Sequence, residues 1–224
     1  LEKGSLPQGA STKNAGFACF GSISEIIDDL KNHTEEEVIQ LIQKRYAGLQ
    51  LLRKNLGDEA LDFKLLGGYE LFLKDDEAFY EQCLQKIPFI NEVIKPLFKT
   101  DVFSKEVDRF NFGNIFEYLI FNPFEAQIDT GNMMQALLKK AHQNDILILN
   151  NQTVTDYQET TENVEVVTNG ITFKTNKLLF TTNGFASKIT NNQVQPARAQ
   201  VLITKPIPNL DIKGTFHLDQ GYYY

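Results

Sequence analysis

The chain has 224 residues, 42% of them hydrophobic and 23% charged, values typical of a globular protein with one large domain or two small ones. A net charge of −7 argues against nucleic acid or an anionic membrane as main partner, because both attract Lys and Arg. No apolar run reaches the roughly 20 residues that span a bilayer. No signal peptide is visible, so a cytoplasmic protein is expected. Cys19, Cys83 and the three histidines lack metal-ligand spacing, so no metal site is expected.

Two capping boxes predict helices near the start of the chain. Ser22–Glu25 and Thr34–Glu37 each place Ser or Thr three residues before Glu, which satisfies two backbone N–H groups at a helix start. The first box should begin a short helix through Leu30. The second should begin a long helix, with apolar residues at three-and-four spacing up to a stop signal at Gly57.

The next segment mixes strands and helices. Within residues 61–73, Gly67-Gly68 separates two short apolar runs and predicts two strands joined by a turn. Asp75-Asp76-Glu77 predicts the start of a helix that Pro88 should end, and a further helical segment leads to Pro96.

Residues 101–124 are aromatic and irregular and predict one or two strands, closed by the breaker Asn122-Pro123. Asp129 should cap the following helix. The spacing of the apolar residues in this helix predicts core packing rather than a ligand site. These residues are Met133, Met134, Leu137, Leu138 and Ala141.

From Ile146 onward, short β-type runs alternate with turns. Asn169-Gly170 is a strong signal for a type I′ hairpin turn. The runs of residues 153–175 should form a small antiparallel meander. The predicted strands are Ile146–Leu149, Thr153–Tyr157, Val164–Thr168, Ile171–Lys174, Lys177–Thr181, Val201–Thr204 and Thr215–Tyr224.

No nucleotide-binding loop is complete in the sequence. Gly4 and Gly9 have the glycine spacing of a phosphate-binding P-loop, but Ala10 stands where that loop needs Lys. No GxG occurs, so the dinucleotide fingerprint is absent from the chain. Glu2 fits the acid that ends the second strand of a dinucleotide-binding βαβ unit and accepts hydrogen bonds from ribose hydroxyls. A Glu near a terminus is otherwise a solvated charge.

Glu2 is followed by the run Gly9-Ala10-Ser11-Thr12-Lys13-Asn14-Ala15-Gly16. An acid with such a run at this distance resembles the segment after the second strand in the D-amino-acid-oxidase-like flavoenzymes, the glycine and sarcosine oxidase group. Small residues let a backbone approach a flavin and its diphosphate closely. The resemblance implies FAD as cofactor, with contacts from Glu2, Gly9, Ala10, Ser11, Asn14, Ala15 and Gly16.

The second half of the chain continues this resemblance. The run Thr153-Val154-Thr155 is similar to the family strand whose Val backbone meets the adenine ring, which implies that role for Val154. Residues 178–184 resemble the family strand that ends in a small-residue turn beside the cofactor. This likeness implies contacts from Thr182 and Gly184.

Two residues become candidates for binding the substrate. Residues 195–200 resemble the Pro-x-Arg-Gly-Gln stretch that enters the substrate domain, although Ala199 replaces the usual Gly, and Arg198 is the candidate anion-binding residue. Residues 216–224 resemble the strand that carries the family's substrate-side Tyr. Tyr222 is therefore the candidate catalytic residue that binds a substrate carboxylate, and the other interpretation is that the adjacent tyrosines belong to a packing strand.

The resemblance implies a mixed α/β fold with two discontinuous, incomplete domains. A Rossmann-like FAD/NAD(P)-binding domain is expected from residues 1–58 and 126–190, and a substrate domain with a mixed antiparallel sheet from residues 59–125 and 191–224. The chain is expected to be an internal piece of a longer protein, lacking the N-terminal GxGxxG and the C-terminal part.

The implied function is oxidation of an amine or amino acid at its C–N bond, with hydride transfer to the flavin. Glycine, sarcosine, proline-type and D-amino-acid substrates all stay open, as does the oligomeric state. The alternative is a non-catalytic binding or structural module on the same scaffold, unable to hold FAD because the diphosphate loop is lacking.

Overall fold

The computed structural model describes residues 1–190, 194–197, 200–221 and 223. The chain divides into two compact units. The small unit comprises residues 1–13 and 139–205, and the large unit comprises residues 14–138 and 206–224. Both units therefore join segments that are far apart in the sequence. The boundaries expected for cofactor and substrate domains differ from these, and that assignment stays a prediction.

Helices and strands occur in both units, which confirms the expected mixed α/β class. No helix in the described part of the chain is apolar over a length that could cross a membrane. The small unit contains the 3-10 helices η1 (Gly9–Ser11) and η2 (Asn183–Lys188) and the strands β6 (Val154–Glu159), β7 (Val164–Thr168) and β8 (Thr172–Thr175). The large unit contains β1 (Phe17–Ala18), α1 (Ile23–Asn32), α2 (Glu35–Leu56), α3 (Asp58–Leu61), β2 (Gly68–Leu71), α4 (Glu77–Phe98), β3 (Ser104–Val107), β4 (Tyr118–Asn122), β5 (Ala126–Gln127), most of α5 (Thr130–Gln143) and β9 (Thr215–Leu218).

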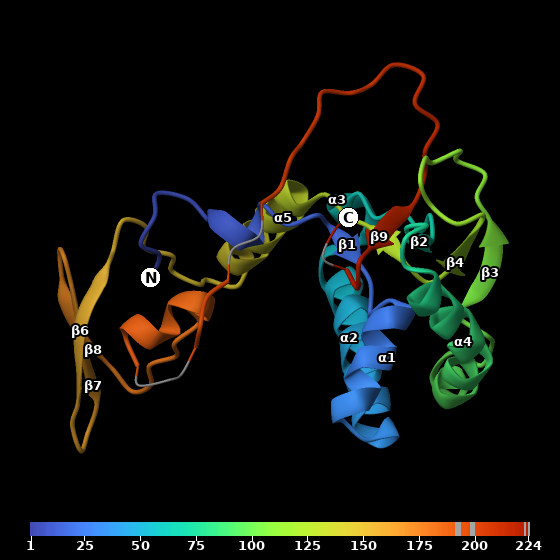
Figure 1. Cartoon of the computed structure of the whole chain (residues 1–224). Coiled ribbons are helices and arrows are strands. Elements are labelled where there is room, and N and C mark those ends of the chain that lie inside the picture. The colour runs from blue at the N-terminus through green and yellow to red at the C-terminus, as the bar shows by residue number, and fades with distance from the viewer. Residues whose placement is uncertain (191–193, 198–199, 222, 224) are drawn as a thin grey trace. The chain divides into compact units, whose positions relative to one another are not determined.

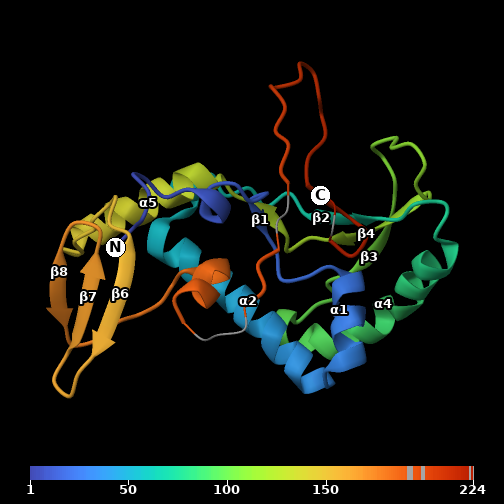
Figure 2. The same cartoon turned by 60° about the vertical axis from the view of Figure 1, so that its left-hand side comes forward.

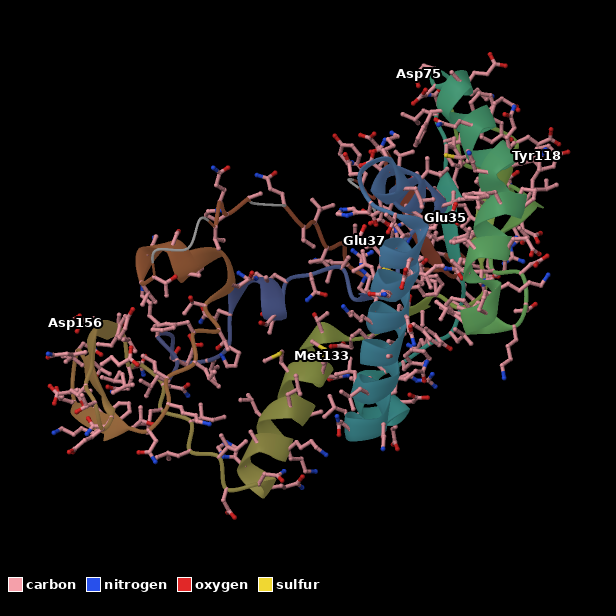
Figure 3. All side chains as sticks on the ribbon, turned by 90° about the horizontal axis from the view of Figure 1, so that it is seen from below. Glu35, Glu37, Asp75, Tyr118, Met133 and Asp156 are labelled. Carbon is pink, nitrogen blue, oxygen red and sulfur yellow. The ribbon has the colours of Figure 1, made fainter. Side chains whose placement is uncertain are left out.

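Both predicted capping boxes are confirmed. The Ser22 hydroxyl accepts a hydrogen bond from the Glu25 N–H at the start of α1, and the Glu25 carboxylate accepts one from the Ser22 N–H. Thr34 and Glu37 form the same pair at the start of α2, where acids also interact favourably with the helix dipole. Figure 3 labels Glu35 and Glu37 at this end of the helix. Gly57 ends α2 with a φ of 87°, a conformation that favours glycine.

Helix α4 is continuous, so the predicted break at Pro88 is wrong. A proline inside a helix removes a backbone hydrogen bond and costs about 3 kcal/mol or more. Ile90, Ile94 and Phe98 lie four residues apart on one face and are 0%, 0% and 9% exposed. Because burying each such side chain contributes about 1.5–3 kcal/mol, packing of this face maintains the helix through Pro88 and Pro96.

The sheet of the large unit has the strand order β3-β4-β2-β9, with β2 parallel to β9 and the other neighbours antiparallel. Strands β3 and β4 confirm the prediction for residues 101–124, and β9 confirms the first part of the last predicted strand. The hairpin predicted around Gly67-Gly68 is wrong. Strand β2 begins at Gly68 and pairs with β4 and β9, whereas Leu61 of the preceding run ends α3.

The two faces of this sheet bury different side chains. Glu70, Ile120 and His217 are cross-strand neighbours on one face. Ile120 packs into the core formed with α1, α2 and α4, which lie beside one another in Figure 1. The opposite face packs Tyr69 and Leu119 among aromatic rings. On the face toward the helices, Glu70 and His217 therefore lie among apolar side chains.

The sheet of the small unit is the expected antiparallel meander β6-β7-β8, seen clearly in Figure 2. Asn169 and Gly170 do lie in the turn between β7 and β8. Neither has a positive φ, so the predicted type I′ turn is wrong. The Thr168 hydroxyl instead stabilises the turn, accepting from the Gly170 and Ile171 N–H groups at 3.2 and 2.9 Å.

The predicted strands at residues 146–149, 177–181 and 201–204 are wrong. Leu147, Leu179 and Ile203 are 78%, 85% and 93% exposed, and no described residues form a ladder with these runs. An apolar run becomes a strand when a neighbour pairs with its backbone, and propensity alone does not supply that neighbour.

The core packing expected for the methionine-bearing helix is also wrong, because α5 has no buried residue and Met133 (Figure 3) is half-buried. Val166 and Thr168 are the buried residues among those described in the small unit. Backbone pairing, rather than a large apolar core, holds that unit together.

Replacing Leu119 with Ala tests the packing of the large unit. Leu119 is 0% exposed on β4, so Leu119→Ala should lower the free energy of unfolding by about 2–5 kcal/mol through lost burial and an unfilled cavity. Leu51 on α2 is 58% exposed, so Leu51→Ala should change that free energy by less than about 1 kcal/mol. Urea unfolding followed by circular dichroism measures both, and equal losses would contradict the packing described.

Candidate functional site

Glu2 is held beside residues 149–152 of the small unit by backbone hydrogen bonds. Its N–H donates to the Leu149 carbonyl at 2.9 Å, and its carbonyl accepts from the Gln152 N–H at 3.0 Å. Its carboxylate Oε1 accepts from the Gly4 N–H at 2.7 Å. These bonds fix the half-buried Glu2 side chain in place, although residues 1–3 do not form a strand.

Val154 begins β6 two residues after Gln152, so the pairing of Glu2 brings Glu2 and Val154 into one neighbourhood. Val154 pairs with Thr168 of β7, and the register shifts between Val154 and Asp156. Such a bulge bends a strand and changes the direction of its backbone groups. The two residues predicted for the ribose and the adenine thus lie on one edge of the small unit.

Gly9, Ala10 and Ser11 form η1 in the small unit, and all three are exposed. Gly9 has a φ of 78°, and the space where a Cβ would stand is open. An exposed backbone of this kind, with no bulky side chain, lets another group approach closely.

Asn14, Ala15 and Gly16 belong to the large unit, where the first two are exposed and Gly16 is buried. The Asn14 Oδ1 accepts from the Gly16 N–H at 3.0 Å, and the Gly16 carbonyl accepts from the Ile128 N–H at 2.8 Å. A Cβ on Gly16 would lie 2.3 Å from the Ile128 carbonyl oxygen, and its φ is 75°. Glycine is therefore required where the small-residue run enters β1.

Thr182 and Gly184 lie at the start of η2 in the small unit. The Thr182 carbonyl accepts from the Phe185 N–H at 3.0 Å. Its hydroxyl is buried and has no hydrogen-bond partner among the described residues. An unsatisfied buried hydroxyl costs about 1–3 kcal/mol, so a polar ligand group at this position would stabilise the unit. This orphaned atom fits the predicted role of Thr182 as a cofactor contact.

The predicted substrate residues Arg198 and Tyr222 lie outside the described residues. The predicted cofactor residues divide between the units, with Asn14, Ala15 and Gly16 in the large unit and Glu2, Gly9, Ala10, Ser11, Val154, Thr182 and Gly184 in the small unit.

The large unit also contains a buried polar cluster that the sequence reasoning missed. Glu70 on β2, Glu125 before β5 and His217 on β9 are 3%, 2% and 4% exposed. Glu125 Oε1 accepts from the Thr215 hydroxyl at 2.7 Å and forms a hydrogen bond with His217 Nε2. The available signal was an acid within an apolar run, as at Glu70 in Gly-Tyr-Glu-Leu-Phe and at Glu125 between Phe and Ala.

Glu70 links this cluster to the start of α1. Its carboxylate accepts from the Ser24 N–H and the Ser22 hydroxyl, each at 3.2 Å, and also contacts the Ser24 hydroxyl. A cavity of about 10 Å³ lies between these groups, near the volume that one water needs. Asn122 lines it, and the Asn122 Nδ2 is buried with no partner in the described part of the chain.

Burial changes the protonation of these groups. It raises the pKa of Glu70, an effect that the hydrogen bonds from Ser24 partly offset. Burial alone would lower the pKa of His217, but the hydrogen bond to Glu125 and its negative charge outweigh burial and raise that pKa. Burial, reinforced by Glu125, raises the pKa of Cys19 to about 12, so Cys19 is a neutral thiol and a poor nucleophile.

The side chains of Glu70, Glu125 and His217 are all nearly fully buried, and an unpaired charge is costly at such depth. Across the described residues, no group of three or more His, Cys, Asp or Glu side chains is arranged to hold a metal ion.

The family model described as "DAO: FAD dependent oxidoreductase" matches residues 1–224. Similar solved structures include glycine oxidase from Geobacillus kaustophilus, with a TM-score of 0.63, 16% identity and coverage of 84% of this chain and 49% of that chain. L-proline dehydrogenase from P. horikoshii has a TM-score of 0.59 and 16% identity, with 97% of this chain and 56% of that chain covered.

Iminodiacetate oxidase from Chelativorans sp. BNC1 also has a TM-score of 0.59 and 16% identity, with 83% of this chain and 49% of that chain covered. No curated protein matches the chain. The chain spans about half the length of the three solved structures. At this identity, the likeness shows a shared fold.

Gly16→Ala tests the junction between the small-residue run and β1. A methyl group at Gly16 would meet the Ile128 carbonyl, so the variant should break the Gly16–Ile128 hydrogen bond and destabilise the protein by more than about 1 kcal/mol. Gly9→Ala is the matched control, because Gly9 has a similar φ of 78° in open space. Amide exchange at Ile128, measured by NMR, should accelerate in Gly16→Ala and not in Gly9→Ala. Unchanged exchange in both would contradict the contact.

Proposed function

The chain belongs to the family of FAD-dependent oxidoreductases, and on that premise we propose that the whole protein oxidises the C–N bond of an amine or amino acid. The similar structures include glycine oxidase, iminodiacetate oxidase and L-proline dehydrogenase, and the compounds in these enzyme names are amines or amino acids. Since the chain spans about half the length of those proteins, the proposal concerns the whole protein.

The pairing of Glu2 with residues 149–152 is the observation that carries the proposal. It fixes the position of an acid in the small unit, and a dinucleotide site uses such an acid to bind its ribose. A carboxylate accepts hydrogen bonds at two oxygens, so Glu2 can hold the Gly4 N–H and still accept from ribose hydroxyls. We assign the ribose to Glu2 and the adenine to the backbone of Val154.

Other residues of the chain have properties that suit FAD. The orphaned Thr182 hydroxyl and the neighbouring Gly184 are proposed to contact the cofactor. The exposed backbone of η1 and the Asn14–Gly16 turn are proposed to face the diphosphate and the flavin. When bound, FAD supplies the acceptor for the hydride that leaves the substrate carbon. The protein's own contribution is to bind and orient the cofactor and the substrate.

For the substrate, we propose from the resemblance alone that Tyr222 and Arg198 bind its carboxylate. A substrate carboxylate would suit a Tyr hydroxyl and a guanidinium, because both donate hydrogen bonds to anions. Glycine, sarcosine, proline-type and D-amino acids all carry a carboxylate next to the amine. A non-catalytic module is not favoured, given the family to which the chain belongs.

Anaerobic mixing of the FAD-loaded whole protein with glycine, sarcosine, L-proline and D-alanine tests the reaction. At least one amine should bleach the visible flavin band, because hydride transfer reduces the flavin. Glycolate is the matched control, since it carries a hydroxyl in place of the amine of glycine. Equal bleaching by glycolate would contradict C–N specificity. A whole protein that shows no flavin absorbance after incubation with FAD and removal of the unbound FAD would contradict flavin binding.

Glu2→Gln tests the ribose contact. Glutamine keeps an acceptor for the Gly4 N–H but removes the charge, so the dissociation constant for FAD should rise about tenfold or more, as expected when a charge-assisted hydrogen bond of about 1.5–3 kcal/mol is weakened. Glu159→Gln is the control, because Glu159 is an exposed acid at the end of β6 in the same unit. Titration of the whole protein with FAD, followed by flavin fluorescence, measures both. Equal affinities of the two variants for FAD would contradict the proposed contact between Glu2 and the ribose.

A further inference from the structure

Arg109 follows β3 closely in the sequence, and its side chain reaches the buried Tyr69 of β2. The guanidinium Nη2 donates a hydrogen bond to the Tyr69 hydroxyl at 2.6 Å. The guanidinium carbon lies 5.7 Å from the centroid of the Tyr69 ring and 5.2 Å from that of Phe110, and at such distances a cation is attracted to the face of a ring. Arg109 is exposed, whereas Tyr69 is 4% exposed. The pair therefore brings the hydroxyl of a buried residue next to a cation in contact with water.

Arg53 on α2 gives a comparison within the same unit. Its guanidinium also lies over an aromatic ring, 4.1 Å from the centroid of Phe63. The chain supplies an acid for it, because Arg53 Nε and Nη2 donate to the two carboxylate oxygens of Asp58, each at 2.7 Å. Two parallel bonds of this kind are the geometry that a guanidinium favours with a carboxylate. A guanidinium that lies on an aromatic ring is thus satisfied here by a carboxylate.

Arg109 pairs with no carboxylate among the residues that the structure describes. Its neighbour Asp108 is engaged with the backbone of the loop: Oδ1 accepts from the Phe110 N–H at 2.8 Å, and Oδ2 accepts from the Phe112 N–H at 3.0 Å. A guanidinium carries five N–H donors, and the bond to Tyr69 uses one of them. Arg109 therefore keeps the donors that a carboxylate needs.

The Tyr69 hydroxyl adds a further donor at a fixed position. Since its oxygen accepts from Arg109, its own proton is available for another acceptor. The ring stacks on Phe216 with centroids 5.4 Å apart and packs against Phe121 at 4.8 Å. On its edge, a Cβ on Gly214 would lie 2.8 Å from the ring. Packing thus fixes this donor before any ligand arrives, which lowers the entropy lost on binding.

Three half-buried rings lie beside these donors. Phe110, Phe112 and Phe216 contact one another, with centroids 5.5 Å apart for Phe110–Phe112, 5.0 Å for Phe110–Phe216 and 5.3 Å for Phe112–Phe216. Phe110 also contacts Tyr69, at 5.0 Å. An apolar group laid against these rings would remove further apolar surface from water, which is favourable.

We propose that Arg109 and the Tyr69 hydroxyl bind the carboxylate of a small free organic acid whose apolar part packs on Phe110, Phe112 and Phe216. The guanidinium supplies the opposite charge and two parallel donors, as Arg53 does for Asp58. The phenol donates a third hydrogen bond, and the rings favour an acid with an apolar body over acetate. The site uses neither Arg198 nor Tyr222, and it does not depend on FAD binding.

The test is an NMR titration of the whole protein, with ¹⁵N-labelled arginine, by phenylacetate. The Nε–H signal of Arg109, identified by its loss in Arg109→Lys, should shift in a saturable way over the millimolar range. Phenylacetamide is the matched control ligand, because it keeps the ring but has no charge, and it should cause no such shift. The Arg53 signal should not move with either compound, since Asp58 already occupies that guanidinium.

Two variants separate ligand binding from a purely structural role of the pair. Tyr69→Phe keeps the ring and removes the hydroxyl, so the affinity for phenylacetate, read from the Arg109 signal, should fall about threefold to tenfold. Tyr80→Phe is the control, because Tyr80 is a similarly buried tyrosine of the same unit (5% exposed) that contacts neither Arg109 nor Phe110, and its affinity should equal that of the unmodified protein.

An Arg109 signal that does not respond to phenylacetate would overturn the proposal, because an acid elsewhere in the whole protein would then occupy the guanidinium or no ligand would bind it. An equal response to phenylacetamide would also overturn it, since charge would then play no part. Equal affinities of Tyr69→Phe and Tyr80→Phe would contradict the contact with the hydroxyl and leave Tyr69 the role of holding the loop after β3 against the sheet.

Discussion

The hydrogen bond between Glu125 and His217 holds together segments of the large unit that lie far apart in the sequence. It joins β9, which comes from the last part of the chain, to the segment that leads into β5. Through the parallel pairing of β9 with β2 and the contacts of Glu70, the same cluster extends to the start of α1. Removing one partner would leave the other buried without compensation, and this is more costly than losing an exposed ion pair.

The small unit follows a different principle. Among its described residues, Val166 and Thr168 are the buried ones, and the unit is held by the ladder of β6-β7-β8 and by the pairing of Glu2 with residues 149–152. Backbone hydrogen bonds exposed to water contribute little net free energy. Ligand binding would therefore add much to its stability, because a cofactor that binds only the folded form shifts the equilibrium by mass action.

The two units also differ in how they hold the residues predicted to contact the cofactor. Glu2 and Val154 lie in the lightly packed unit, whereas the Asn14–Gly16 turn is anchored in the densely packed one. Gly16 cannot move without losing its bond to Ile128, and the cluster around Glu70 restrains the residues that follow. The Asn14–Gly16 turn is thus held in place by the protein's own contacts, and a turn fixed in this way lowers the entropy that binding of any ligand there must oppose.

The sequence by itself determined the features that depend on neighbouring residues. The capping boxes at Ser22 and Thr34 and the stop at Gly57 follow from local hydrogen bonding and backbone conformation, and both were predictable. The meander of residues 153–175 was predictable from its alternating runs, although the type of turn between β7 and β8 was not. The acid Glu2 and the small-residue run likewise indicated the FAD-dependent family. The continuation of α4 through Pro88 was not predictable, since burial of Ile90 and Ile94 against distant elements outweighs the local cost.

Only the tertiary structure decided which apolar runs became strands. Residues 146–149 and 201–204 have the composition of strands, yet no described neighbour forms a ladder with them. The structure likewise decided that Glu70, Glu125 and His217 meet in one buried cluster. A charge in an apolar run signals burial, but its partner lies far along the chain, and the free energy of that pairing depends on the packing of both segments.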